Sequence, residues 1–174
     1  MDVDIFAGTS PAPDFGGGVD AVVAALRGQG LQVDTELRNA RFARLAISSA
    51  DQAAKMEFGV DWRMNAPVML PVGPVLHADD AVANKVCALF GRAEVRDYID
   101  VDAILTSGRY TQQQLLDLAA DHDPGFDRML FAEALEAIDR LPASLFEPYR
   151  VDSSGVSAIC QRMHGWASEI RGQR

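Results

Sequence analysis

The first third of the chain alternates polar and apolar residues, which is the pattern of half-buried strands. Asp2–Phe6 begins this pattern, and the glycine- and proline-rich stretch Ala7–Gly18 predicts a loop after it. The helical spacing of Val19–Gln29 predicts a helix that ends before Gly30. Three more strand-like runs follow, and then a proline-bearing stretch that suits only a short edge strand: Leu31–Leu37, Arg41–Ser49, Ala53–Trp62 and Val68–Leu76.

In the second half, apolar residues recur at helical spacing. We expect five helices: Asp80–Phe90, Glu94–Thr106, Thr111–Asp121, Asp127–Arg140 and Ser154–Arg171. Asp79 is the expected N-cap of the first helix, Gly91 marks its end or a kink, and Thr111 caps the third. A small sheet followed by helices predicts an α+β fold, with a sheet core over residues 1–76 and a helical region over 77–174 packed on it.

Composition and charge argue against several classes of protein and of site. Sixteen basic and 25 acidic residues give a net charge of −9, which argues against a protein held on nucleic acid by bulk charge but leaves a local basic patch open. Cys87 and Cys160 form no CxxC motif, so a disulfide framework or structural zinc site is not expected. The longest apolar stretch, Ala66–Leu76, is too short to span a membrane. With an acidic N-terminus unlike a signal peptide, these features predict a cytoplasmic protein without a membrane partner.

Carboxylates mark two of the predicted strands. Asp2 and Asp4 are two residues apart, so they share one face of their strand, as Lys55 and Glu57 share one face of another. If the two strands are neighbours, three carboxylates converge, which is the ligand set for two Mg²⁺ ions in phosphoryl or nucleotidyl transfer. The alternatives are a solvated strand face for Asp2 and Asp4, and an ion pair with a neighbour for Glu57.

Lysine is rare in this chain. Among the 16 basic residues only Lys55 and Lys85 are lysines, and the compact charge of a lysine suits contact with a phosphate. Chance retention of two lysines is the alternative.

A second group of charges begins at Lys85. Lys85, Arg92 and Arg96 recur at spacings of seven and four residues. If one helix runs through them, they line one side of it and suit a triphosphate or an RNA backbone. The alternative is a helix pair held by salt bridges from Arg96 to Asp97 and Asp100, and such a pair also orients Lys85.

Together these stretches resemble the nucleotidyltransferase AbiEii/AbiGii toxin family of abortive-infection and type IV toxin–antitoxin systems. DVDIF resembles the metal-binding end of its first motif, and Lys55-x-Glu57 resembles its second. Asp79 with Lys85 and ALFGR resembles the third motif. Arg92 with Arg96–Asp100 resembles the fourth, and the segment from Asp123 to Pro142 is similar to the helical C-terminal region of the family.

The resemblance implies a small mixed sheet of the polymerase-β-like nucleotidyltransferase fold, followed by a C-terminal helical bundle. It implies a two-ion Mg²⁺ site and the transfer of NMP from an NTP to an acceptor hydroxyl. The acceptor would be an RNA, with tRNA as the first candidate, and the protein partner would be a cognate antitoxin. Asp2, Asp4 and Glu57 would be catalytic and hold the metal. The phosphates would be held by Lys55, Lys85, Arg92 and Arg96, with structural support from Asp97 and Asp100.

Residues outside these motifs give further expectations. Local RNA contacts are expected at Arg38, Arg41 and Arg44. Trp62 and Trp166 are interpreted as packing residues rather than platforms for stacked bases. An acidic run would either be a solvated edge or meet a basic partner such as an antitoxin: Asp117, Asp121, Asp123 and Asp127.

The first motif of the family normally opens with a Gly-Gly or Gly-Ser pair at a helix start, where backbone N–H groups grip phosphates. In this sequence Met1 directly precedes Asp2, and the run Gly16–Gly18 lies after the carboxylates. We therefore expect these 174 residues to bind Mg²⁺–NTP weakly and to transfer nucleotides slowly or not at all. A degenerate or truncated member that binds nucleotide or a partner protein without turnover is the alternative function.

Overall fold

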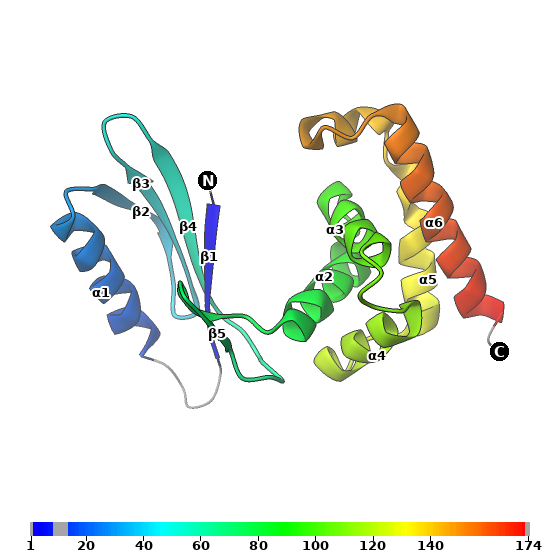
Figure 1. Ribbon diagram of the computed structural model, residues 1–174, viewed down its shortest axis with the longest axis horizontal. Helices are drawn as coiled ribbons and strands as arrows, with labels where there is room; N and C mark the ends of the chain where they lie inside the picture. The colour runs from blue at the N-terminus through cyan, green and yellow to red at the C-terminus, as the bar shows by residue number, and fades with distance from the viewer. Residues whose placement is uncertain (1, 9–13, 173–174) are drawn as a thin grey trace. The chain divides into compact units, whose positions relative to one another are not determined.

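A computed structural model describes residues 2–8 and 14–172 of the chain. The chain forms two compact units, Met1–Arg63 and Met64–Arg174. The first unit holds a small sheet with one helix, and the second holds a hairpin followed by helices, which confirms the α+β prediction (Figure 1). The expected boundary after residue 76 differs from this division, because the segment between Met64 and Leu76 belongs with the helices.

The sheet of the first unit has four strands in the order β1-β4-β3-β2: β1 (Asp2–Ala7), β4 (Ala53–Val60), β3 (Phe42–Ser48) and β2 (Gln32–Arg38). β1 runs parallel to β4, whereas β4, β3 and β2 pair antiparallel, so the sheet is mixed. The alternation of polar and apolar residues predicted all four strands to within about two residues.

Helix α1 (Phe15–Gly28) covers one face of this sheet (Figure 1). The predicted loop Ala7–Gly18 is wrong at its end, because the run Gly16–Gly18 forms part of the first turn of α1. Asp14 caps that turn, and its carboxylate accepts a hydrogen bond from the backbone N–H of Gly17 at 2.9 Å. The cap offsets the low helix propensity of the glycines.

A hydrophobic core lies between α1 and the sheet. Its buried members are Val19, Val33, Ala43, Leu45, Ile47 and Phe58. In β3 every second residue is buried, as expected for a strand with one face on a core. The residues between them therefore lie on the face that α1 does not cover.

The second unit opens with a two-stranded hairpin, β5 (Val68–Leu70) and β6 (Gly73–Val75). The edge strand predicted over Val68–Leu76 is therefore wrong: the stretch folds back on itself in a separate sheet. A turn after β5 reverses the chain, and Gly73 has a φ of 115°, a conformation that side chains disfavour.

All five predicted helices are present: α2 (Ala78–Arg92), α3 (Val95–Thr106), α4 (Gln112–His122), α5 (Arg128–Glu136) and α6 (Ser153–Gly172). The helix predicted over Asp127–Arg140 ends early and continues as the 3-10 turn η1 (Ala137–Arg140). A further 3-10 segment, η2 (Ala143–Tyr149), was not predicted. No helix in the described part of the chain is long and apolar enough to cross a membrane.

Two predicted helix ends differ from the structure. The N-cap of α2 is His77 rather than Asp79, and the Nδ1 of His77 accepts from the backbone N–H of Asp79 at 3.2 Å. The helix runs through Gly91 to Arg92, and its C-cap Ala93 has a left-handed φ of 51°. Thr111 caps α4 as predicted.

The helices pack around a large apolar core that contains Trp166, Tyr98 and Phe131. Trp166 is 1% exposed, which confirms it as a packing residue, whereas Trp62 is 41% exposed.

Tyr98 gives a test of this core. Its hydroxyl is buried and donates to the carbonyl of Ala134 at 2.6 Å, and burial raises the pKa of Tyr98 to about 12. Replacing Tyr98 with Phe should lower the free energy of unfolding by about 1 kcal/mol, because the hydrogen bond is lost. Urea denaturation measures this, and Tyr149→Phe, at an exposed site, should change nothing. Equal stability of wild type and Tyr98→Phe would contradict the prediction.

Candidate functional site

The two carboxylate-bearing strands are neighbours, as predicted. β1 and β4 pair in parallel, with Asp4 opposite Glu57 and Asp2 opposite Lys55 in the backbone register. Directly paired residues of adjacent strands point to the same side of a sheet, so Asp4 and Glu57 share one face. The side chain of Asp2 lies outside the described residues.

Glu57 lies on the face of the sheet opposite α1. Phe58, the next residue in β4, is buried in the core under α1, so Glu57 points away from that core. In β3, Arg44 sits between the buried residues Ala43 and Leu45, and it pairs with Glu57 in the backbone register. Four described side chains thus gather on one surface, which we call the polar face: Asp4, Arg44, Lys55 and Glu57.

Glu57 is held by two cations. Arg44 Nε donates to Glu57 Oε1 at 2.8 Å, and Lys55 Nζ lies 3.2 Å from the same oxygen. Partial burial acts to raise the pKa of Glu57, but hydrogen bonds from Lys55 and Arg44 outweigh it and hold that pKa below its usual value. Glu57 is therefore ionised at neutral pH, and the ion-paired alternative describes its contacts.

Two of the four described side chains on the polar face, Asp4 and Glu57, are carboxylates. Carboxylate oxygens are hard ligands of the type that Mg²⁺ prefers, and Asp4 is an exposed carboxylate beside Glu57. Among the described side chains there is no group of three or more His, Cys, Asp or Glu placed to hold a metal ion. Any three-carboxylate set on this face would thus include Asp2.

The second predicted cluster lies within the second unit. Lys85 on α2 donates to Asp100 on α3 at 2.7 Å. Arg92 binds Asp97 through two hydrogen bonds of 2.9 and 2.7 Å. Arg96 is exposed and forms no ion pair with any described residue. The three cations do not lie on one helix, because α2 ends at Arg92 and Arg96 belongs to α3. The alternative of a helix pair held by salt bridges to Asp97 and Asp100 describes these contacts, but Arg92 and Lys85 form them instead of Arg96.

Asp97 has a clear structural position. It is fully buried, and its carboxylate also accepts from the backbone N–H of Glu94 at 3.1 Å, completing a capping box at the start of α3. Burial acts to raise the pKa of Asp97, but the bonds from Arg92 and Glu94 outweigh it and lower that pKa. The Arg92–Asp97 pair therefore links the end of α2 to the start of α3.

The arginines expected to meet RNA have different surroundings. Arg38 donates to Asp20 at 2.5 Å and to the carbonyl of Gly16 at 3.0 Å, so it ties β2 to α1. Arg41 is exposed, and its guanidinium donates to the carbonyl of Val60 at 3.5 Å. Arg44 is the arginine that reaches the polar face. Its role as the partner of Glu57 was not predicted.

One family model, described as the nucleotidyl transferase AbiEii toxin of type IV toxin–antitoxin systems, matches residues 1–155. The match includes the polar face and both ion pairs between α2 and α3. No curated protein and no solved structure matches the chain. Since the matched segment spans most of the sequence, the chain belongs to the AbiEii family of nucleotidyl transferase toxins of type IV toxin–antitoxin systems.

Proposed function

We propose that this chain transfers a nucleoside monophosphate from an NTP to a hydroxyl of an RNA, with Mg²⁺ as cofactor and the polar face as its active site. The observation that supports this most is the parallel pairing of β1 with β4. It sets Asp4 beside Glu57, and Lys55 opposite Asp2 in the register. Family membership supports nucleotidyl transfer, whereas the metal dependence, the position of the active site and the RNA acceptor are proposed.

The reaction needs charge compensation at the phosphates. The acceptor oxygen forms a bond to the α-phosphorus while the bond to the bridging oxygen breaks, so pyrophosphate leaves and the hydroxyl proton passes to solvent. Mg²⁺, when held by Asp2 and Asp4, supplies positive charge against the developing negative charge. The negative charge that develops on the leaving pyrophosphate is stabilised more effectively by a fixed cation than by mobile water.

The chain itself offers Lys55 as that fixed cation. Glu57 holds its ammonium at 3.2 Å, and Arg44 anchors Glu57 from the next strand. Because the Lys55 side chain is 42% exposed, it can exchange part of its contact with Glu57 for a phosphate oxygen. We therefore assign Glu57 as the residue that positions Lys55. Glu57 is also the third candidate carboxylate ligand of the metal.

Lys85 is the proposed second phosphate ligand, with Arg92 and Arg96 as further candidates and Asp100 as the partner that orients Lys85. Replacing Lys85 with Ala should weaken NTP binding about tenfold or more, because a charge-assisted bond is lost. Its half-exposed pair with Asp100 contributes only about 0–1 kcal/mol, so stability should change little. Isothermal titration with NTP measures the affinity of both proteins, and equal affinities would show that Lys85 is not a phosphate ligand.

The acceptor is tested directly. Purified protein is incubated with total tRNA, Mg²⁺ and each α-³²P-labelled NTP in turn, and label is followed into the tRNA band. We expect labelling from at least one NTP, lost on chelation of the metal. NTP binding by folded protein without any labelling would instead favour the non-catalytic alternative. A cognate antitoxin is the expected protein partner, and the cytoplasm, where NTPs and tRNA are found, is the expected location.

A further inference from the structure

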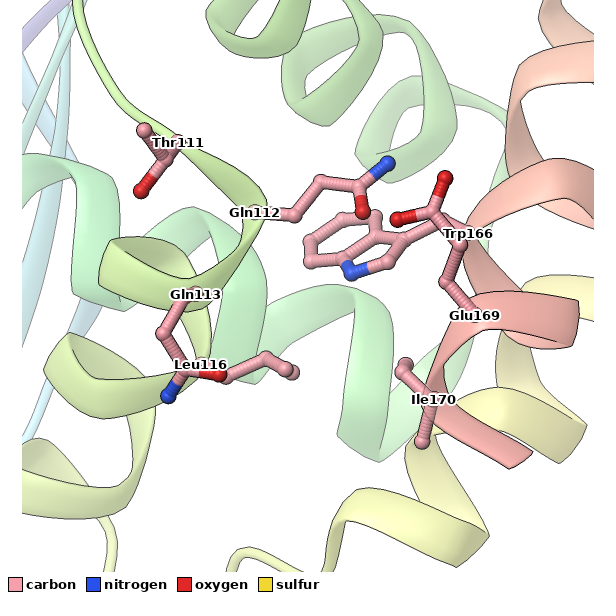
Figure 2. Close-up of a pocket in the computed structure, with 7 residues that line it drawn as sticks. All are labelled: Thr111, Gln112, Gln113, Leu116, Trp166, Glu169 and Ile170. Atoms are coloured by element: carbon pink, nitrogen blue, oxygen red, sulfur yellow. The ribbon is translucent and has the colours of Figure 1, made fainter. Parts of the chain in front are cut away.

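A cavity of about 390 Å³ lies between α4 and α6 in the second unit. Figure 2 shows the residues that line it: Thr111, Gln112, Gln113, Leu116, Trp166, Glu169 and Ile170. Its α6 residues lie beyond residue 155, where the family match ends. No step of the proposed transfer uses this cavity.

Trp166 carries an unused hydrogen-bond donor. Its side chain is 1% exposed, and its Nε1 is buried with no hydrogen-bond partner in the described part of the chain. The ring is fixed by an edge-to-face contact with Phe131, at 5.1 Å between centroids and 80° between planes. A buried donor without an acceptor costs about 1–3 kcal/mol, so a carbonyl oxygen placed here would recover stability.

Two more polar side chains of the cavity are free among the described residues. Neither the amide of Gln112 nor the carboxylate of Glu169 forms a hydrogen bond or ion pair there. Figure 2 shows both side chains together with the indole ring of Trp166, and the apolar side chains of Leu116 and Ile170 also line the cavity. The cavity therefore combines one buried donor, an amide, a carboxylate and an apolar surface.

A neighbouring cavity of about 520 Å³ extends the same site. It shares Gln112, Trp166 and Glu169 with the first cavity, and Tyr110 and Arg162 also line it. Arg162 is already bound to Asp102 through two hydrogen bonds of 2.5 and 2.9 Å. That arginine is thus not a free cation for an acidic ligand. Glu169, an exposed carboxylate that lines both cavities, disfavours an anionic ligand beside it.

We propose that this cavity binds a small neutral molecule that carries an amide-type group, a carbonyl oxygen together with an N–H. The carbonyl accepts from Nε1 of Trp166, the N–H donates to Glu169 or Gln112, and the apolar body packs on Leu116 and Ile170. A carboxylate ligand would be repelled by Glu169, and an amine would leave the indole donor unpaired. The volume lies in the range of about 300–1,000 Å³ typical of small-molecule sites.

The two tryptophans make the test specific. The ¹H–¹⁵N spectrum of the full chain contains one indole signal from Trp166 and one from Trp62, which Trp62→Phe assigns. Three probes with the same ring are titrated: benzamide, benzoate and benzylamine. We expect benzamide to shift the Trp166 signal saturably and leave that of Trp62 unchanged, with the other two binding at least about tenfold more weakly.

Variants then separate the contacts. Glu169→Gln should reduce the discrimination against benzoate by about tenfold, because it removes the repelling charge, whereas the exposed Glu147→Gln should reproduce wild type. Trp166→Phe should lose benzamide binding, followed by ligand-observed NMR, with circular dichroism checking its fold. The proposal is overturned if no probe shifts the Trp166 signal up to its solubility limit, which would leave a water-filled cavity. Equal binding of all three probes, or equal shifts of both indole signals, would overturn it as well.

Discussion

Replacing Asp4 with Asn is expected to slow nucleotidyl transfer at least about a thousandfold, because a metal bound at a phosphate supplies several kcal/mol of charge stabilisation. Asn keeps the size of the side chain and removes the charge that would hold the cation. Asp4 is exposed, so the sheet should fold as before. The measurement is initial-rate labelling of tRNA from the preferred NTP, with folding followed by circular dichroism.

Asp34 on β2 provides a matched control for this experiment. It pairs in register with Ala46, which lies on the same side of β3 as Arg44, so Asp34 is another exposed acid on that side of the sheet. It sits on the opposite edge of the sheet from β1. Asp34→Asn should therefore transfer at the wild-type rate. Full activity in Asp4→Asn, or equal loss in both variants, would show that the polar face is not the active site.

Replacing Asp97 with Ala is expected to lower the free energy of unfolding by about 3 kcal/mol, since it removes a buried carboxylate that binds Arg92 and caps α3. The value lies at the low end for a buried pair because the Arg92 side chain is half exposed. Asp100→Ala on the same helix breaks a more exposed pair and should cost only about 0–1 kcal/mol. Equal effects of the two substitutions would contradict this assignment.

The same variant has a defined pH dependence. The pKa of Asp97 is lowered in the folded protein, so its contribution is fully present above the ordinary carboxyl value of 3.8 and disappears as the pH falls below that value. The stability difference between wild type and Asp97→Ala should therefore be constant near neutral pH and shrink in acid. Urea denaturation at about pH 7 and at about pH 3 measures it. A difference that grows in acid would reverse the sign and exclude an ionised Asp97.

The sequence predicted the strands well and their partners incompletely. Alternation of residues defines a strand without naming its neighbour, so the pairing of β1 with β4 was conditional until the sheet order was known. The pair Arg44–Glu57 was within reach of sequence reasoning. β3 and β4 are joined by a tight turn, closed by a hydrogen bond of 2.9 Å from Ser49 N to Gln52 O, and that turn sets Arg44 opposite Glu57.

The helical half shows what local patterns miss. Lys85, Arg92 and Arg96 recur at helical spacing, yet the chain turns at Ala93 in a left-handed conformation that alanine rarely adopts, and Arg96 belongs to a different helix. Gly91 indicated an end or a kink near this point, but nothing in the local sequence marks Ala93 itself as the left-handed residue. The ion pairs Lys85–Asp100 and Arg92–Asp97 depend on the packing of α2 against α3, which is a tertiary property.

The parallel pairing of β1 with β4 also has a consequence for the order of synthesis. β2, β3 and β4 follow one another through short antiparallel connections, so each can pair as soon as the next has emerged from the ribosome. β1 must wait until β4, the last strand of the sheet, has been made. Glu57 and Lys55 are therefore joined to Asp4 only at the end of that sequence. Nascent chains that stop before β4 carry the first acidic strand without its partners and are expected to be inert.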